Sequence, residues 1–500
     1  MTTPSWLVGT SLPSAPPLPA TARTEVCVVG AGIAGLVTAY LLAREGRAVI
    51  VLDQGAVAGG ETHRSTAQLV TALDRGWTHL VRHHGIDGAR LAAASHAIAI
   101  DRLETLVHDE QIACDWARVD GWLVGKPGDP TAIDAEHDAA RAAAVDVERL
   151  ARAPLGAVDS GPCLRFPAQA QLDPVALARG LLATLERMGV RVHGDSHVAG
   201  IDGDGPVRVV TAHGPAVVAD AVVLATNSPI HDAVSLHPKQ AAYRTYVVAA
   251  PVPTGAVPHA LFWDMAEPFH YVRLAVDRGA GSQLLLVGGE DHKTGQEDDS
   301  AEMRWARLEA WGRNWFPMMG PVAHRWSGQV MESMDGLAFI GRTETRPDVY
   351  VVTGDSGNGI THGIIAGMLL TDLLQERPNP WAALYDPSRL RVRAAGEMVR
   401  ENLNVAVQLT AWVRGGTADS VDDVPPCGGA IVRRGLTKVA VHRDVAGVVH
   451  EMSAVCPHLR CIVAWNGAEQ SWDCPCHGSR FDATGHVLSG PARDDLEPVA

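Results

Sequence analysis

Four cysteines and two histidines form two short clusters near the end of the 500-residue sequence. They are Cys456, His458 and Cys461 in the first cluster, and Cys474, Cys476 and His477 in the second. Thiolates and imidazoles at such spacing can bind zinc or an iron–sulfur cluster, and paired cysteines can form a disulfide. Zinc sites of this type usually take their two cysteines from one pair and their two histidines from another, whereas each cluster here mixes both types. A disulfide alone would not need the histidines. A redox centre is therefore the interpretation that gives a role to all six cysteine and histidine side chains.

The two clusters resemble the two cluster-binding boxes of Rieske [2Fe–2S] proteins, in which cysteines bind one iron and histidines bind the other. The resemblance implies three pairs: Cys456 with Cys474 on one iron, His458 with His477 on the other, and Cys461 with Cys476 in a disulfide. The stretch LSGPA at 488–492 resembles the proline-containing loop that covers such a cluster.

Three residues beside these boxes bear on the reduction potential of the expected cluster. Ser479 can donate a hydrogen bond to a bridging sulfide and so favour the reduced state. By resemblance, Phe481 replaces a tyrosine that raises the potential in other members. Arg460 replaces a glycine and would raise the potential if it faced the cluster. We expect a potential within the Rieske range of about −150 to +300 mV and below its top.

A glycine-rich turn lies at the opposite end of the sequence, between an expected strand at 26–29 and an expected helix. Its glycines, Gly30, Gly32 and Gly35, have the spacing of a dinucleotide-binding turn that places a helix N-terminus against a pyrophosphate. A second expected strand, at 48–52, ends at Asp53, which can accept a hydrogen bond from a ribose hydroxyl. This acid argues against the alternative, a glycine turn in a generic α/β unit.

The segment after Asp53 resembles the flavin-contacting loop of the D-amino-acid oxidase, glycine oxidase and sarcosine oxidase family. ADAVVLATNSP and TGDSGNGITHG resemble later elements of that family, whose last helix points at the flavin and stabilises negative charge on it. The resemblance implies FAD contacts at Gly30, Gly32, Ile33, Ala34, Gly35, Asp53, Gln54, Arg64, Ser65, Thr66, Ala67, Gln68, Val198, Thr226, Gly354, Asp355, Asn358, Gly359, Ile360 and Thr361.

FAD is expected to be held noncovalently. Sarcosine-type members carry a lysine at the position of Thr361, and there is no cysteine between Gly354 and Thr361. His63, in the flavin loop, is the one nucleophile that could form a covalent link.

Short expected strands between 243 and 289 resemble the family's substrate-binding sheet. The resemblance implies catalytic or substrate contacts at His362, Arg244, Tyr246, His270 and Tyr271. Further candidates for substrate contact are Tyr243, Arg273, Glu290, His292 and Trp326. Each of these side chains has an alternative, purely structural role, because tyrosine and arginine are also common on the outer faces of strands.

The expected fold class is α/β (α+β), with a Rossmann-type FAD-binding domain, an interleaved β-sheet substrate domain and a small all-β Rieske domain. The expected boundaries are a leader at 1–23, an FAD-dependent oxidoreductase domain at 24–376, a helix and linker at 377–426 and a Rieske domain at 427–500. Within 24–376 we assign nucleotide binding to about 24–76, 160–232 and 330–376, and substrate binding to about 77–159 and 233–329. The helix is expected over 391–413.

Together these resemblances imply an FAD-dependent oxidoreductase acting on the C–N bond of a small amine or amino-acid-like substrate. A one-electron cluster provides an exit to a ferredoxin, a cytochrome or a quinone-linked acceptor, which favours a dehydrogenase over an oxidase. Two alternatives stay open: an O2-using FAD oxidase with a structural cluster, and an electron-transfer or redox-sensing protein without a dedicated substrate.

Composition limits the expected partners. The net charge is −15 without a Lys/Arg run, which argues against nucleic-acid binding. No apolar run approaches the ~20 residues of a membrane span. The first residues lack an export signal, so we expect a cytoplasmic protein, and a homodimer is compatible with the sequence.

Overall fold

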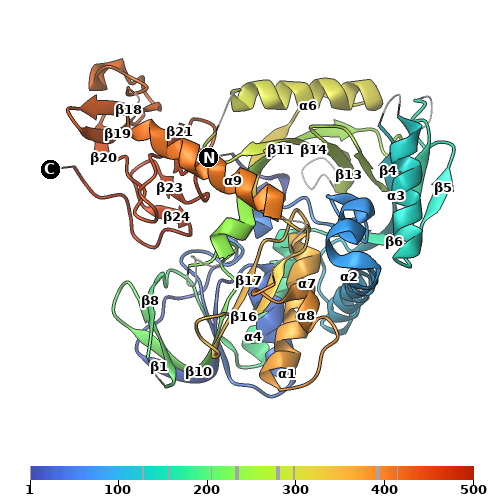
Figure 1. Cartoon of the computed structure of the whole chain (residues 1–500), viewed down its shortest axis with the longest axis horizontal. Coiled ribbons are helices and arrows are strands. Elements are labelled where there is room, and N and C mark those ends of the chain that lie inside the picture. Colours follow the sequence, from blue (N-terminus) through green and yellow to red (C-terminus); the bar gives the residue numbers. More distant parts are fainter. Residues whose placement is uncertain are drawn as a thin grey trace.

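The computed structural model describes residues 2–126, 129–155, 158–203, 205–230, 236–276, 282–296, 299–389, 395–413 and 415–499. Two large sheets form the body of the molecule, and the small C-terminal strands lie against one side of it (Figure 1). The expected start of a helix at Arg391 lies outside the described residues, and the helix is described from Ala395.

The first sheet has the architecture expected of a nucleotide-binding domain. Its strands are β1 (Ala22–Val29), β2 (Val49–Leu52), β7 (Arg191–His193), β8 (Val198–Asp202), β9 (Val207–Thr211), β10 (Ala216–Leu224), β16 (Phe339–Arg342) and β17 (Val349–Thr353). The central order is β16-β17-β10-β1-β2-β7, and all pairs are parallel except β16 with β17. The last four residues of β1 and all of β2 are buried, as continuous apolar runs in parallel sheets require.

The second sheet forms the opposite wall of the body. Its strands are β3 (Gln68–Leu69), β4 (Ala117–Val124), β5 (Glu148–Leu150), β6 (Cys163–Gln171), β11 (Gln240–Val252), β12 (Leu261–Asp264), β13 (His270–Val276), β14 (Gln283–Lys293) and β15 (His324–Ser333). The order is β15-β11-β14-β13-β12-β4-β6-β3, with β5 paired to β6. β6 falls in the segment 160–232 that we assigned to nucleotide binding, but it pairs with β4 in this sheet.

Most helices pack against the two sheets, and the last one lies beside the C-terminal region (Figure 1). These helices are α1 (Ile33–Arg44), α2 (Gly76–Asp109), α3 (Pro130–Ala142), α4 (Pro174–Arg187), α6 (Ala301–Trp315), α7 (Gly359–Leu374), α8 (Ala382–Tyr385) and α9 (Ala395–Gln408). α1 packs against α7 beside the first sheet, and α6 crosses β11 and β14 of the second (Figure 1). α4 starts where its sequence predicts, because Asp173 accepts hydrogen bonds from Val175 and Ala176 N–H and Pro174 occupies the first turn.

Short 3-10 turns connect these elements: η1 (Ser5–Leu7), η2 (Thr62–Arg64), η3 (His237–Lys239), η5 (Leu409–Trp412) and η6 (Val421–Asp423). The expected leader packs against the body. In η1, Trp6 is buried, donates from Nε1 to the Ser65 carbonyl at 3.1 Å and lies under the guanidinium of Arg273.

The C-terminal region is all-β, as expected. It contains one sheet of β18 (Gly429–Arg434), β19 (Thr437–Arg443) and β20 (Val449–Ser453), and one of β21 (Ala464–Asn466), β22 (Ser471–Asp473), β23 (Arg480–Asp482) and β24 (Val487–Ser489). All pairs in both sheets are antiparallel. The α/β fold class with a separate small all-β region is therefore confirmed.

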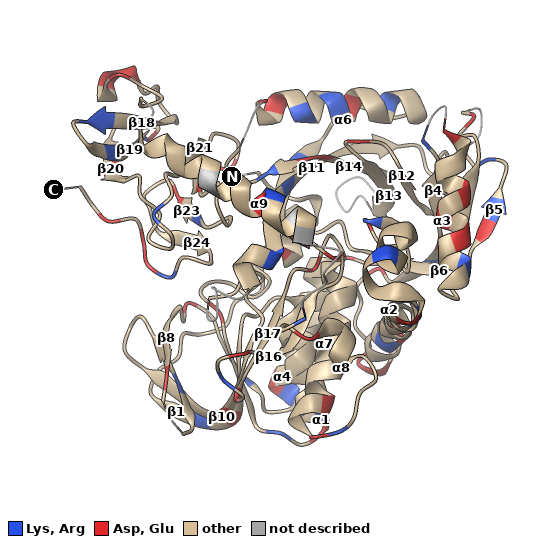
Figure 2. Cartoon of the chain, viewed as in Figure 1, with Lys and Arg blue, Asp and Glu red and all other residues tan. Residues whose placement is uncertain are grey.

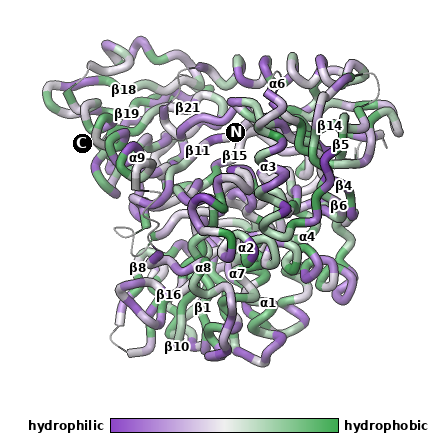
Figure 3. Tube along the Cα trace, turned by 45° about the vertical axis from the view of Figure 1, so that its right-hand side comes forward, coloured by the Kyte–Doolittle hydropathy of each residue, from purple (hydrophilic) through white to green (hydrophobic). Residues whose placement is uncertain are grey.

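Apolar segments gather in the layer of α1, α7 and β1, while more polar segments lie toward the outside (Figure 3). Charges of both signs are mixed along surface elements such as α6 (Figure 2). Among the described helices, none combines the length and apolar character that crossing a membrane needs.

Candidate FAD cavity and cluster site

A cavity of about 1080 Å³ lies between the two sheets. Its floor contains the C-terminal ends of β1, β2, β10 and β17, the edge where α/β sheets bind their ligands. The C-terminal region supplies part of the wall through Arg480, residues 487–490, Ala492 and Arg493. The sequence did not predict that the expected Rieske domain borders this cavity.

The glycine turn has the close contacts that its sequence predicts. Gly30 has a φ of +108°, and a Cβ there would lie 2.3 Å from the Ala225 carbonyl oxygen. A Cβ on Gly35 would lie 1.8 Å from the Gly30 carbonyl oxygen, so this glycine serves helix–strand packing. Gly32 borders the cavity and leaves room for a ligand beside α1. This glycine cradle and the cavity volume fit FAD.

Most of the residues proposed to contact FAD line the cavity. They are Gly30, Gly32, Ile33, Ala34, Asp53, Gln54, Arg64, Ser65, Thr66, Gln68, Val198, Thr226, Asp355, Asn358, Gly359 and Ile360. Gly35, Ala67, Gly354 and Thr361 do not line it. His63 does not line it either; its Nδ1 bonds the Ala58 carbonyl at 2.9 Å.

Asp53 is held by the glycine turn itself. Its carboxylate accepts hydrogen bonds from Ala31 N–H at 2.6 Å and from Gly55 N–H at 3.0 Å. Burial raises its pKa to about 6. The acid therefore braces the turn and stands at the cavity, where a ribose is expected.

Only three of the ten candidates for substrate contact line the cavity: Tyr243, Tyr271 and His362. The alternation of side chains along β11 explains part of this result, since Tyr243 and Thr245 face the cavity while Arg244 and Tyr246 face away. Tyr246 stacks on His292 beneath α6.

The other candidates have structural partners. His270 stacks on Trp311 and contacts Asp264, and Glu290 pairs with Arg307. Arg273 donates to the carbonyls of Thr66, Ala67 and Leu172, and Trp326 donates to the carbonyl of Arg64. The structure therefore does not place the predicted residues Arg244, Tyr246 and His270 where a substrate in this cavity would touch them.

Three acids, Asp74, Asp291 and Asp355, line the part of the cavity between β14 and α7. Burial raises the pKa of Asp74 and of Asp355 to about 7, and it raises the pKa of Asp291 well above the ordinary range. His362, in the first turns of α7, hydrogen-bonds through Nδ1 to the Asp355 carbonyl at 2.9 Å. Burial lowers the pKa of His362, so the ring is neutral. Asp74 and Asp291 were not predicted, because no local motif marks them.

The cluster boxes come together as expected for a metal centre. The Cys456 and Cys474 side chains are in hydrogen-bond contact, and the rings of His458 and His477 lie 5.1 Å apart. Nδ1 of His477 is buried and has no hydrogen-bond partner among the described residues, which suits a metal ligand. These four side chains fit the two-cysteine, two-histidine ligand set of a Rieske cluster.

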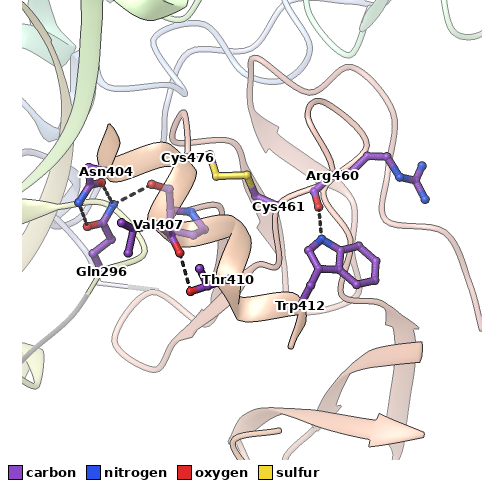
Figure 4. The surroundings of a disulfide bond; sticks show 9 residues. Gln296, Asn404, Val407, Thr410, Trp412, Arg460, Cys461 and Cys476 are labelled. Carbon is purple, nitrogen blue, oxygen red and sulfur yellow. Dashed lines mark hydrogen bonds between the residues drawn. A yellow bond between two sulfur atoms is a disulfide. The ribbon is translucent and has the colours of Figure 1, made fainter. Parts of the chain in front are cut away.

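A disulfide joins Cys461 to Cys476 beside this site, and α9 lies next to it (Figure 4). The sulfur atoms of Cys461, Cys474 and Cys476 lie within 4.8 Å of one another. This trio does not form a metal site of its own, because the disulfide leaves only Cys474 with a free thiol.

The residues expected to tune the cluster differ in their exposure. Ser479 is fully buried and hydrogen-bonds to Cys456, while its hydroxyl accepts from Ala492 N–H at 3.0 Å. Arg460 is exposed, and its side chain points away from the disulfide (Figure 4). Its carbonyl accepts from Trp412 Nε1 at 2.9 Å. The condition under which Arg460 would raise the potential, a cation facing the cluster, is therefore not met.

A buried ionic network, which we call the seam, joins the flavin loop to the second box. It consists of Glu61, Arg64, Arg244, Ser327, Glu469, Asp473 and Arg480. Arg64 Nη1 lies 3.1 Å from Glu469 Oε2, and Ser327 Oγ bonds Glu469 Oε1 at 2.5 Å. Arg244 Nη1 donates to Ser327 Oγ at 2.7 Å.

The seam continues to the residue that precedes Cys474. Arg480 Nε lies 3.2 Å from Asp473 Oδ1, and Arg480 Nη1 lies 3.8 Å from Glu61 Oε1. Burial alone would raise the pKa of Glu469, but Arg64, Arg244 and Arg480 outweigh it and lower that pKa to about 2. Arginines also lower the pKa of Asp473, so Glu469 and Asp473 are ionised and matched by buried arginines.

Comparison with known proteins agrees with this geometry. The family model "FAD dependent oxidoreductase" matches residues 25–373, and the model "Rieske [2Fe-2S] domain" matches residues 417–500. The Rieske 2Fe-2S iron-sulfur protein YhfW of Bacillus subtilis is 28% identical over 498 residues, covering 99% of this chain and 97% of that protein.

Two further relatives match the larger domain alone. Gamma-glutamylputrescine oxidoreductase of Escherichia coli is 27% identical over 373 residues, covering 70% of this chain and 83% of that protein. The crystal structure of glycine oxidase from Geobacillus kaustophilus aligns with a TM-score of 0.63 at 17% identity, covering 74% of this chain and all of that one. The fold is thus shared with glycine oxidase.

These findings confirm the expected fusion and both of its cofactors, FAD and a [2Fe–2S] cluster. The chain belongs to the family of FAD-dependent oxidoreductases and carries a C-terminal Rieske domain.

Proposed function

We propose that the protein is a dehydrogenase that oxidises the C–N bond of a small amine and sends the electrons through its own Rieske domain to an external one-electron acceptor. The observation that carries the proposal is the shared wall: Arg480 and residues 487–490 belong to the Rieske domain and line the FAD cavity. Bound FAD would accept two electrons from the substrate, whereas a Rieske cluster carries one at a time.

The charges of the cavity favour an amine over a free amino acid. Asp74, Asp291 and Asp355 line it, while Arg244 and Arg273, which could bind a carboxylate, contact other protein groups. Five arginines also line the cavity: Arg64, Arg75 and Arg480 are paired with Glu469, Glu332 and Asp473, and Arg400 and Arg493 are solvent-exposed. A cationic amine would offset the cost of ionising the buried acids. One relative, gamma-glutamylputrescine oxidoreductase, is named for an amine-containing substrate.

His362 and Tyr271 are the proposed catalytic residues on this wall. Nδ1 of His362 donates to the Asp355 carbonyl, so Nε2 carries a lone pair, and it has no hydrogen-bond partner among the described residues. Such a neutral ring can accept a proton from the substrate nitrogen. The Tyr271 hydroxyl lies 3.3 Å from Thr245 Oγ1 and can orient the substrate.

The assignments of individual ligands follow the same proposal. Cys456 and Cys474 would hold one iron and His458 and His477 the other, and the cavity residues would hold FAD noncovalently. We also keep the domain boundaries at 24–376, 377–426 and 427–500, a cytoplasmic location, a homodimer, and a ferredoxin, cytochrome or quinone-linked acceptor as parts of the proposal.

The test is an anaerobic panel of amines and amino acids, read at flavin and cluster wavelengths together. We expect at least one amine to reduce both chromophores. Reduction of the flavin alone would favour an O2-using oxidase with a structural cluster. If no compound in the panel reduces the flavin but a reduced ferredoxin reduces it, the protein would instead be an electron-transfer protein.

A further inference from the structure

A histidine of the FAD domain lies against both proposed histidine ligands of the cluster. The ring of His237, in η3, is 4.7 Å from the ring of His458 in an edge-on contact. It is 5.0 Å from the ring of His477 in a stacked contact. Only 5% of His237 is exposed. The histidine edge of the cluster site therefore contacts the chain's own FAD domain.

His237 is held from the side of the FAD cavity. The Pro229 carbonyl hydrogen-bonds to the ring, and Nε2 has no hydrogen-bond partner among the described residues, which assigns that bond to Nδ1. Three residues before Pro229, Thr226 lines the FAD cavity, and so does Ile230 just after it. One short segment thus borders the cavity and fixes the ring that touches the ligands.

The second box is clamped to the FAD domain on both sides of His477. Gln296 Nε2 donates to the Pro475 carbonyl at 2.9 Å, and Gln329 Nε2 donates to the Gly478 carbonyl at 3.0 Å. A Cβ on Gly478 would lie 2.3 Å from the Ala242 side chain, so the two surfaces are in close contact. This packing leaves His237 as the group directly between the FAD domain and the two ligand rings.

We propose that His237 is a positioning residue that shields the two ligand histidines and forms the contact through which electrons cross from the FAD domain to the cluster. Each crossing oxidises the flavin by one electron and reduces the cluster by one, and no bond in the protein forms or breaks. This inference rests on the proposed function for its direction of flow, but its test uses no substrate.

The first test measures shielding in the holoprotein. Diethyl pyrocarbonate modifies accessible imidazoles, and mass spectrometry locates the product. We expect the exposed His213 and His486 to react and His477, 8% exposed, to resist. In His237→Ala, His477 should react at a rate near that of His486, whereas His237→Phe, which keeps a ring in place, should protect it. His213→Ala is the matched control.

The second test measures electron crossing without an amine. The flavin is reduced anaerobically by light and deazaflavin with oxalate as the electron donor, and the cluster is followed by its absorbance. We expect His237→Ala to slow cluster reduction at least about tenfold, as loss of a group that orients metal ligands commonly does. The EPR g values of the reduced cluster should also shift, which a residue that only joined domains would not cause while the seam is intact.

Two results would overturn the inference. One is modification of His477 in the wild-type protein as fast as that of His486. The other is a His237→Ala protein with wild-type protection, crossing rate and g values. If no amine reduces the flavin, only the proposed function fails, because oxalate and not an amine supplies the electrons in this experiment.

Discussion

The cavity and the seam both contain desolvated acids, but the pKa values of these acids are shifted in opposite directions. Asp74 and Asp355 have pKa values raised to about 7 by burial, whereas the pKa of Glu469 is lowered to about 2 because arginines surround it. Desolvation acts to raise the pKa in both regions, but three arginines surround Glu469 and reverse its shift, so the partner charges set the difference. The seam is electrostatically complete within the protein, while the cavity is arranged for a positive group that arrives from outside.

The largest expected effect comes from breaking the seam. Glu469→Ala leaves Arg64 without the acid it pairs with at 3.1 Å, and removing one member of a buried ion pair costs about 3–5 kcal/mol of unfolding free energy. Guanidinium unfolding followed by visible circular dichroism of the cluster measures this loss. Glu497→Ala, at an exposed acid, should stay within about 0.5 kcal/mol of wild type. Equal stability of the two variants would show that the seam does not stabilise the contact between the FAD domain and the Rieske domain.

The next effect concerns the cavity. Asp291→Asn removes the charge that we expect to face a cationic amine, and hydrogen bonds to charged groups contribute about 1.5–3 kcal/mol. KM for an amine that reduces the flavin should therefore rise at least about tenfold. The control is Asp220→Asn, whose side chain is 55% exposed in a surface ion pair with Arg23. An unchanged KM would remove Asp291 from the substrate site.

The two regions should respond to pH in opposite directions in the FAD-free protein. The folded pKa of Glu469 lies below its unfolded value of 4.5, so its contribution is present above pH 4.5 and lost as the pH falls toward 2. The folded pKa values of Asp74 and Asp355 lie above their unfolded value of 3.8, so stability falls as the pH rises from 3.8 to 7.

Urea unfolding across this pH range separates the two contributions. Glu469→Gln should flatten the limb below pH 4.5, and Asp74→Asn should flatten the limb above pH 3.8. If both variants kept the wild-type profile, other groups would control it and the contrast between the regions would not hold.

The smallest expected effect is on the reduction potential of the cluster, where a buried group is compared with an exposed one. Arg460→Gly should leave the reduction potential unchanged, because an exposed charge is screened by water and salt. Ser479→Ala removes a fully buried hydroxyl that hydrogen-bonds to Cys456. We expect it to destabilise the reduced cluster by about 1 kcal/mol and so lower the potential. Redox titration followed by EPR measures the reduction potential of both variants. A larger shift of the potential in Arg460→Gly than in Ser479→Ala would contradict this prediction.

Local motifs predicted most of the FAD wall and the pairing of Cys461 with Cys476, because short stretches around Gly30 and Cys474 carry their own geometry. Arg244, which we expected to contact the substrate, does not line the cavity, for a different reason. The sequence showed that it lies on a strand, but not which face of the strand borders the cavity, and its partners Ser327 and Asp473 come from distant segments.

His237 shows the same limit more clearly. No spacing in the sequence connects it with His458, which follows more than two hundred residues later, and only the docking of the two domains brings the rings together. Asp291 was missed because a single acid on an expected strand has no pattern around it.

The loop at 487–493 has a consequence for biosynthesis. Gln54, just after the second strand of the glycine fingerprint, donates a hydrogen bond to the Leu488 carbonyl, and both residues border the FAD cavity. The ribosome therefore synthesises the residues that line this cavity in two separate stages. The fingerprint is made first, and the loop of the Rieske domain is made near the end of the chain. A nascent chain stopped at the linker would carry every glycine of the fingerprint and still lack one wall of the cavity.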